Sequence, residues 1–492
     1  MIAKIAQLLS YHPYVTTAKI SVALNSAAAI LLFACLFFYF YRKYFWKNQA
    51  ARELFWLVNI IFAFIIFVKF IIGVLYQGYI PELTFFFAIP SPKLLGFGWL
   101  LTATGVFLFF LYFRKKIESL STSKFLAILF AVFFIFSVSV AGIREGAVSI
   151  ADPFTRVYWE YTGNIPLISS AKNFLHDYIT LEPRLARHSI THPPGYSLLL
   201  YFFHKLFAAD FLGLSLLAVF ISGFVLWPLL FLCRCFLTET EARRALEILI
   251  FIPSLVMMTA TSMEGFFMLA VWSAIALCYL GWKKNIWLAV LGGVAAAISL
   301  FSNFLFLLLG PFFVLLCGYT LKDFINAPKE RSKIITRMFF SLLSFFLFFM
   351  IIWQWSQYSI SDNFFAARSA NSFEVESNFN SISTYLMYLL MNIASFLIYL
   401  GLPLAIIFFT GLPKTFKESN FLFKSGVGVL ALFLLVGIFQ GNVERLWLFI
   451  LPFFIIFANK LWQEENQTLF NAVLSLLFFQ IIITQAIFYT FY

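Results

Sequence analysis

The sequence predicts an all-α polytopic membrane protein, because of its composition and the length of its apolar runs. Hydrophobic residues make up 62% of the chain and charged residues 11%, and the mean hydropathy is +0.92. Soluble globular domains contain about 25% charged residues. Runs of about 17 to 25 apolar residues, enough for a helix to cross a bilayer core of about 30 Å, recur along the whole sequence. We therefore expect a bundle of membrane-spanning helices.

About fourteen apolar runs qualify as spans. They divide the chain into an N-terminal element of three spans (1–124), a core (125–460) and a C-terminal span (461–492). Residues 1–17 lack the continuous apolar core and cleavage site of a secretory signal, so we expect the first span to direct insertion. The predicted spans are 20–41, 54–76, 94–113, 125–142, 211–236, 245–262, 265–281, 286–302, 303–320, 338–356, 384–410, 421–440, 446–459 and 468–490.

Basic residues predict the orientation, because lysine and arginine are retained on the cytoplasmic side in short loops. The basic clusters fall on alternate loops if the large polar loop 143–194 lies outside the membrane. Topology and attraction to anionic lipid explain the formal charge of +12, so we expect membrane lipids as partners and no nucleic acid. The clusters are Arg42-Lys43-Lys47-Arg52, Arg114-Lys115-Lys116, Arg234-Arg243-Arg244, Lys283-Lys284, Lys322 to Arg337 and Lys414-Lys417-Lys424.

The five cysteines lie in or beside predicted spans and show neither a disulfide framework nor a metal-binding spacing. Cys233 and Cys235 are two residues apart, so on a helix they point in different directions and favour a filler role over a redox or metal site. The outer loop contains carboxylates and histidines, so binding of a divalent ion there stays open, although no recognised ligand spacing is present. We assign no metal ligands and no cofactor.

The outer loop ends in the most informative segment of the chain, Thr191-His192-Pro193-Pro194-Gly195. Two prolines forbid a helix through the turn, and an apolar helical pattern resumes over 196–207. About 12 residues are too few to cross a membrane, so this helix is expected to lie in the outer interface. The turn would hold His192 at the membrane surface, unless it acts only as a structural stop.

Three acidic residues follow the span that ends at residue 142, namely Glu145, Asp152 and Glu160. Carboxylates just beyond the outer end of a span are well placed to accept a proton from a hydroxyl that approaches from outside. The alternative is that they solvate the loop or pair with Arg144 and Arg156. At least one of the three is expected to be catalytic.

A second polar segment, 356–384, is expected on the same side of the membrane and contains Arg368. Two polar loops on one side can close over a shared cavity. An amphipathic substrate with a polar head and a lipid tail would be handled there.

The order of these features resembles the GT-C membrane glycosyltransferases, the superfamily of protein O-mannosyltransferases and lipid A aminoarabinose transferases. The likeness rests on the acidic outer loop, the His-Pro-Pro-Gly turn before an interfacial helix, and a following span that ends in arginine. Ile252-Pro253-Ser254 with Glu264 is similar to a Pro-Ser and acidic pattern of these enzymes, and Asn442 to Trp447 with Pro452 resembles a late Glu-Arg element of bacterial branches. The resemblance covers roughly residues 125–460.

The resemblance implies a GT-C-like transferase that moves a sugar from a polyprenyl-phosphate monosaccharide to a glycan, lipid or protein acceptor. The site would face outward from a bacterial inner membrane. Asp152 or Glu160 is then the expected general base, with Glu145 as a further candidate. Arginine suits the lipid phosphate because its planar donors match phosphate oxygens. The candidate substrate-binding residues are His192, Arg144, Tyr161, Arg368, Glu444 and Arg445.

Other interpretations stay open at this point. Glu444 and Arg445 could form an ion pair that caps a helix at the interface, and Lys69, inside the second span, could be structural or functional. A transporter or flippase of a lipid-linked solute would have helices broken at mid-membrane, carboxylates deep in spans and repeated halves. The acidic residues fall mostly in loops, which favours an enzyme. A lipid-linked glycan polymerase or ligase would use a similar outer cavity with an oligosaccharide donor.

Overall fold

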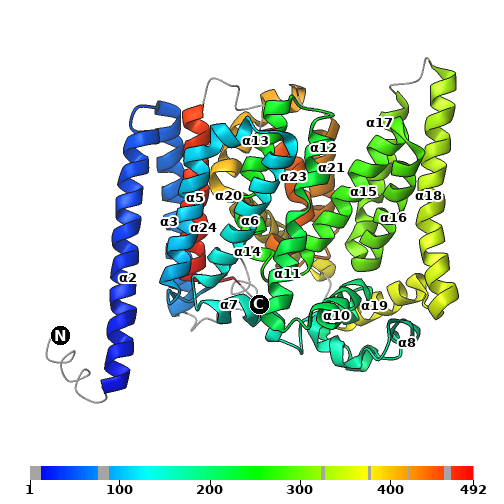
Figure 1. The fold of residues 1–492 in the computed structure, drawn as a ribbon, viewed down its shortest axis with the longest axis horizontal. Coiled ribbons are helices and arrows are strands. Elements are labelled where there is room, and N and C mark those ends of the chain that lie inside the picture. The colour runs from blue at the N-terminus through cyan, green and yellow to red at the C-terminus, as the bar shows by residue number, and fades with distance from the viewer. Residues whose placement is uncertain are drawn as a thin grey trace.

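The computed structural model describes residues 13–75, 88–322, 327–374, 378–418, 421–458 and 467–490 as a bundle of α-helices. Long helices precede the outer loop, and short ones build it (Figure 1). A helix occupies the segment predicted to follow the Pro-Pro turn. The elements are α2 (Pro13–Phe40), the π-helix η1 (Tyr41–Phe45), α3 (Gln49–Leu75), β1 (Ile89–Pro90), α5 (Phe97–Glu118), α6 (Thr122–Gly142), α7 (Ala147–Thr155), η2 (Tyr161–Leu167), α8 (Ala171–His176), η3 (Glu182–Arg184), α9 (Arg187–Ile190) and α10 (Gly195–Phe207).

The remainder of the chain alternates long and short helices. The elements are α11 (Phe211–Gly223), α12 (Leu226–Cys233), α13 (Glu239–Leu249), α14 (Pro253–Met258), α15 (Glu264–Lys284), α16 (Ile286–Ser302), η4 (Phe304–Leu309), α17 (Gly310–Lys322), α18 (Pro328–Ser356), α19 (Ile360–Glu374), η5 (Asn378–Asn380), α20 (Ile382–Glu418), α21 (Phe421–Leu435), α22 (Val443–Leu446), η6 (Leu448–Ile450), α23 (Leu451–Ala458), α24 (Gln467–Ile487) and β2 (Phe488–Tyr489).

The prediction of an all-α multi-pass membrane protein is confirmed. Within the described ranges, 10 helical segments are long and apolar enough to cross a membrane, and α16 and α21 are shorter apolar helices that coincide with two further predicted spans. The predicted spans 245–262 and 446–459 consist of shorter pieces, the end of α13 with α14 and η6 with α23. A total of fourteen crossings therefore stays a prediction.

Two helix breaks touch in the interior of the bundle. Ile252 is extended before Pro253, which starts α14, because proline excludes the α conformation from the residue before it. Gly401 interrupts α20 with a φ of 104°, and a Cβ there would collide with Leu477 and lie 3.4 Å from Pro253 Cδ. Only glycine adopts this φ without strain.

Gln480 of α24 satisfies the backbone groups that the Gly401 break exposes. Its Nε2 donates to the carbonyl oxygen of Ile398 at 2.6 Å, and its Oε1 accepts from the amide of Leu402 at 2.9 Å. A membrane interior contains no water that could fill this role. The side chain therefore allows α20 to change direction inside the bundle.

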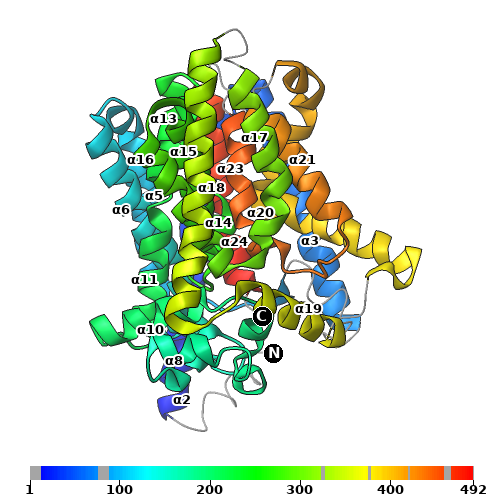
Figure 2. The same ribbon diagram turned by 90° about the vertical axis from the view of Figure 1, so that its right-hand side faces the viewer.

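The two ends of the bundle differ. At one end, which we call the basic end, lie the α5–α6 and α12–α13 connections and the start of α18, all within predicted cytoplasmic segments (Figure 1). At the opposite end, the loop end, lie α7, α8, α10 and α19, which come from the two predicted outer loops (Figures 1 and 2). The two polar loops therefore share one face of the molecule.

A small clasp joins the N-terminal element, the outer loop and the end of α24 at the loop end. β1 and β2 pair antiparallel, with Ile89 opposite Tyr489. Arg144 is buried behind this pair and donates Nη1 to the carbonyl oxygen of Phe488 at 2.8 Å and Nη2 to Ser91 Oγ at 3.2 Å. The three N-terminal spans are thus docked on the core, where α3 also packs against α20 and α24.

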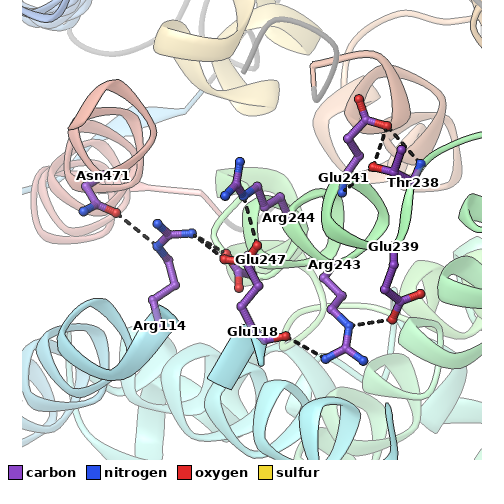
Figure 3. Close-up of polar contacts among 9 residues, drawn as sticks. All are labelled: Arg114, Glu118, Thr238, Glu239, Glu241, Arg243, Arg244, Glu247 and Asn471. Atoms are coloured by element: carbon purple, nitrogen blue, oxygen red, sulfur yellow. Dashed lines mark hydrogen bonds and ion pairs between the residues drawn. The ribbon is translucent and has the colours of Figure 1, made fainter. Parts of the chain in front are cut away.

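A buried ion network joins the helices at the basic end (Figure 3). The Arg114 guanidinium donates to Glu247 Oε2 at 3.1 Å and to Asn471 Oδ1 at 3.1 Å, and the side chain of Glu247 is 0% exposed. Glu118 accepts from Arg244 at 3.1 Å, and Arg243 donates to the carbonyl oxygen of Glu118 at 2.8 Å. These contacts connect α5, α13 and α24 across the end of the bundle.

Replacing Arg114 by Met is expected to lower the free energy of unfolding by about 3–5 kcal/mol, because it removes the cation paired with the buried Glu247 carboxylate. Thermal unfolding of the purified protein in detergent measures this loss. Lys115→Met removes an exposed charge from the next position and serves as the matched control. The double change Arg114→Met with Glu247→Leu should recover part of the loss. Equal unfolding temperatures for the native protein and Arg114→Met would show that the network contributes nothing to stability.

Candidate functional site

Two buried glutamates and a largely buried arginine meet where the outer loop packs on the spans. Arg445 Nη1 lies 3.8 Å from Glu160 Oε1, and Arg445 Nε lies 3.8 Å from Glu264 Oε1. Each glutamate is only 3% exposed. We call Glu160, Glu264, Arg445 and the side chains around them, described below, the buried cluster.

Each charged residue of the buried cluster comes from the end of a helical element. Glu160 directly precedes η2, and Glu264 is the first residue of α15. Arg445 lies on the short α22, which starts after Gly441 (φ 101°) and Asn442 (φ 56°). Glycine and asparagine are the residues that tolerate positive φ best. The sequence thus turns the chain sharply so that Arg445 points into the bundle.

Two serine hydroxyls hold the turn at α22 in place through hydrogen bonds to Glu444. Ser254 Oγ of α14 donates to the carbonyl oxygen of Glu444, and Ser395 Oγ of α20 donates to Glu444 Oε2 at 2.8 Å. Glu444 and Lys69 also interact electrostatically. Consecutive helical residues do not face each other, and the Arg445 side chain points instead toward Glu160 and Glu264. In this structure Glu444 therefore positions the turn that carries Arg445.

Two histidines and two tyrosines surround the Glu160 side of the cluster. His188 Nδ1 lies 3.3 Å from Glu160 Oε1. The ring of Tyr161 contacts those of His188, His192 and Tyr196, with centroids 6.1, 5.8 and 4.9 Å away. The outer loop therefore places aromatic and imidazole rings beside the carboxylate.

The Thr-His-Pro-Pro-Gly turn holds His192 through its ring and its backbone. His192 Nδ1 lies 2.7 Å from the carbonyl oxygen of His188, so Nδ1 carries the proton and donates. Tyr178 OH lies 2.9 Å from the carbonyl oxygen of Ser189 and 3.0 Å from that of His192. A Cβ on Gly195 would collide with the backbone of Phe301, so this glycine lets α10 pack against the end of α16.

Several polar atoms of the buried cluster have no hydrogen-bond partner among the described residues. Buried polar groups are nearly always hydrogen-bonded, and a group without a partner costs roughly 1–3 kcal/mol. A ligand or ordered water that supplies those partners would remove this cost. The atoms are Glu160 Oε1, Glu264 Oε2 and Arg445 Nε. The side chain of Asn303 interacts with Tyr196.

The charges of the cluster follow from burial and from the neighbouring carboxylates. Burial would lower the pKa of Arg445, but Glu264 and Glu160 raise it above its usual value, so the guanidinium stays positive. Burial raises the pKa of Tyr161 well above its usual value, and Glu264 adds to the effect. Burial, together with repulsion from His188, lowers the pKa of His192 to about 4. His192 is therefore neutral at physiological pH, with Nε2 as a hydrogen-bond acceptor.

The other predicted carboxylates lie outside the buried cluster. Asp152 Oδ2 accepts from Arg156 Nη2 at 2.9 Å and from Tyr489 OH at 3.2 Å, and its side chain is 40% exposed. Glu145 forms a half-exposed ion pair with Lys93. Both carboxylates sit at the clasp around β1 and β2.

The structure brings together Glu160, Tyr161, His192 and Arg445 from the predicted set. Arg144 is part of the clasp, and Arg368 lies on α19 with an exposed side chain, outside the buried cluster. Residues 375–377 of the second polar segment lie outside the described residues. The described histidine, cysteine, aspartate and glutamate side chains form no group of three or more that could hold a metal ion.

Sequence reasoning gave no role in the site to His188, Tyr196 or Asn303. His188 stands four residues before His192, and that spacing was a signal for a pair. Asn303 interrupts the apolar stretch between two predicted spans. Tyr196 sits in the first turn of α10 beside the predicted His-Pro-Pro-Gly turn.

No protein-family model, curated protein or solved structure matches this chain. What can be said about function therefore rests on the geometry of the buried cluster and on the chemistry of its residues.

Because the folded protein holds His192 in its neutral form, we expect the stability of the protein to fall at acidic pH. Its folded pKa of about 4 lies below the unfolded value of about 6.5, so the unfolded chain binds the proton more tightly. The contribution of neutral His192 to the free energy of unfolding is fully present above pH about 6.5. It is lost as the pH falls toward about 4, by roughly 3 kcal/mol in total.

Unfolding temperatures measured from pH 7.5 to 4 test this dependence. His192→Gln keeps a donor for the His188 carbonyl but cannot be protonated, so its unfolding temperature should fall less steeply than that of the native protein. His176→Gln, at a side chain that is 61% exposed, should keep the native slope. The same slope in all three proteins would show that His192 is protonated equally in the folded and unfolded states.

Proposed function

We propose that this protein is a GT-C-like membrane glycosyltransferase with about fourteen crossings. It would move a sugar from a polyprenyl-phosphate monosaccharide to an acceptor at the outer face of a bacterial inner membrane. The observation that carries the proposal is the buried cluster, in which a loop carboxylate, Glu160, lies next to the cationic Arg445 at the predicted outer end of the spans. A general base and a phosphate-binding group are the two components that such a transfer needs.

In the proposed reaction Glu160 is the general base. The acceptor hydroxyl attacks the anomeric carbon, its proton passes to Glu160, and the bond between that carbon and the phosphate oxygen breaks. The leaving group is the polyprenyl phosphate, whose growing negative charge Arg445 would stabilise. His188 and the neutral His192 lie beside Glu160 and offer hydrogen bonds to the sugar or the acceptor.

Burial and unused hydrogen-bonding capacity favour Glu160 over Asp152 as the base. Asp152 is half-exposed, and its Oδ2 already accepts hydrogen bonds from an arginine and a tyrosine. Glu160 Oε1 has no hydrogen bond from the described residues and is shielded from water. A proton acceptor with an unused lone pair in a dry site is better suited to base catalysis.

The contacts of Arg445 support a role in binding the donor phosphate. Both of its carboxylate contacts are 3.8 Å long, beyond hydrogen-bond distance, and its Nε has no hydrogen-bond partner among the described residues. A phosphate could take up these donors without breaking a strong ion pair.

Glu160→Gln is expected to lower transfer from a labelled polyprenyl-phosphate sugar by a factor of about 10²–10⁴, because it removes the base with little change in shape. The matched change Asp152→Asn should keep near-native transfer. The purified variants in lipid, with a panel of donor sugars, provide the measurement. If Asp152→Asn is inactive and Glu160→Gln active, the base lies at the clasp.

Arg445→Lys is expected to raise the KM for the lipid-phosphate donor about 10- to 100-fold, because lysine keeps the charge but loses the planar pair of donors. Steady-state kinetics over donor concentration measure the effect. Arg368→Gln, on the exposed face of α19, is the comparison and should leave this KM unchanged. A rise with Arg368→Gln alone would assign the phosphate to α19 and exclude the role proposed for Arg445.

The paired helix breaks favour a second candidate, a transporter or flippase of a lipid-linked or amphipathic solute. Pro253 and Gly401 interrupt two neighbouring helices and touch each other, and broken helices line the solute sites of many transporters. Uptake of a fluorescent polyprenyl-phosphate analogue into proteoliposomes, scored without any acceptor, separates the two functions. Transbilayer movement without sugar transfer would favour the transporter. Transfer from an oligosaccharide donor alone would indicate a lipid-linked glycan polymerase or ligase.

A further inference from the structure

A cavity lies among α15, α16, η4, α17 and α18, and it shares no lining residue with the buried cluster. We call it the side groove. Its volume is about 530 Å³, within the range of about 300–1,000 Å³ typical of small-molecule sites. Figure 2 shows α17 and α18 on the viewer's side of the bundle, with α15 behind them. The groove therefore lies on a side of the bundle that faces lipid.

The residues that line the side groove favour an apolar ligand. Trp282 Nε1 donates to Ser341 Oγ at 2.9 Å, and Ser341 Oγ donates to the carbonyl oxygen of Ala289 at 2.7 Å. These polar groups are thus already satisfied. Leu307, Phe339 and Leu342 line the groove and are exposed, so the groove opens toward the hydrocarbon of the membrane. A hydrocarbon chain fits such a surface.

Cationic side chains surround the end of the side groove that lies at the basic end. Trp282 and Met338 line the groove, and their neighbours are basic. Arg337 donates Nη1 to the carbonyl oxygens of Trp282 at 3.1 Å and of Lys283 at 2.8 Å, which holds its guanidinium at the groove mouth.

Arg331 lies on the same face of α18 as the groove lining. It precedes Ile335 by four residues, Met338 by seven and Leu342 by eleven, and residues with these spacings share one face of an α-helix. Its side chain is exposed. The apolar groove therefore continues, one turn further along α18, into a positively charged surface.

We propose that the side groove binds an anionic diacyl phospholipid of the cytoplasmic leaflet. One acyl chain lies in the groove, and the phosphate lies between Arg331 and Arg337. The positive charge of the mouth selects an anionic over a zwitterionic headgroup, and the predicted orientation places the basic end in the leaflet that is rich in such lipids. The site is separate from the buried cluster and does not depend on the proposed transfer reaction.

Native mass spectrometry of the purified protein, titrated with phosphatidylglycerol or with phosphatidylcholine of the same acyl chains, tests this site. The native protein should retain phosphatidylglycerol more tightly. The pair of changes Arg331→Gln and Arg337→Gln should weaken phosphatidylglycerol binding by about fivefold per arginine and leave phosphatidylcholine binding unchanged. Lys329→Gln with Lys333→Gln removes the same charge from the opposite face of α18 and should have no effect.

A groove-filling variant tests the acyl chain independently of the headgroup. Ala296 lines the groove in α16, and Ala296→Phe should abolish the tight binding of either lipid while the protein stays monodisperse. If that variant aggregates, Leu307→Trp at the exposed rim replaces it. Equal binding of the two lipids by the native protein, equal losses in the two charge variants, or full lipid binding after the groove is filled would each overturn the proposal.

Discussion

The contact of Arg445 with two buried carboxylates brings together parts of the chain that are far apart in sequence. Glu160 comes from the outer loop, Glu264 from the start of α15 and Arg445 from the turn before α23. A buried carboxylate without a cation is strongly destabilising, so the outer loop must dock where Arg445 is available. The contacts of Arg445 with the two glutamates are long, and several polar atoms have no hydrogen bond among the described residues. Docking of the loop therefore does not satisfy every polar group of the cluster. The arrangement is stable enough to define a site and leaves polar groups for a ligand.

The helix breaks explain how the turn that carries Arg445 is held. Pro253 starts α14 and places Ser254 where its hydroxyl meets the carbonyl oxygen of Glu444. Gly401 allows α20 to bend against Pro253, and Gln480 replaces the backbone partners that the bend removes. At the Gly401 break a side chain thus satisfies the backbone groups that the bend exposes. The irregular backbone segments lie near the buried cluster, whereas α5, α6 and α15 are regular helices.

Composition and apolar runs were enough to predict the helical membrane bundle and most of its long helices, because bilayer thickness fixes the length of a span. The segments 245–262 and 446–459 were harder, since Pro253 and Pro452 divide apolar runs whose length alone indicates a crossing. Glu160 and Arg445 were found from their residue types, but their proximity depends on tertiary packing. Local pattern also could not distinguish Glu160 from Asp152. Asp152 meets Tyr489 of β2, from the far end of the chain, and such a contact cannot be read from local pattern.

The position of the Arg144 ligands in the sequence has a consequence for biogenesis. This arginine anchors the start of the outer loop, yet its carbonyl partners belong to residues 485 and 488, more than three hundred positions later. During synthesis Arg144 is made long before those carbonyls exist. Arg144 must therefore stay solvated until α24 has entered the membrane and β2 has paired with β1. Final ordering of the loop, and with it of Glu160, is one of the last events in the assembly of the protein.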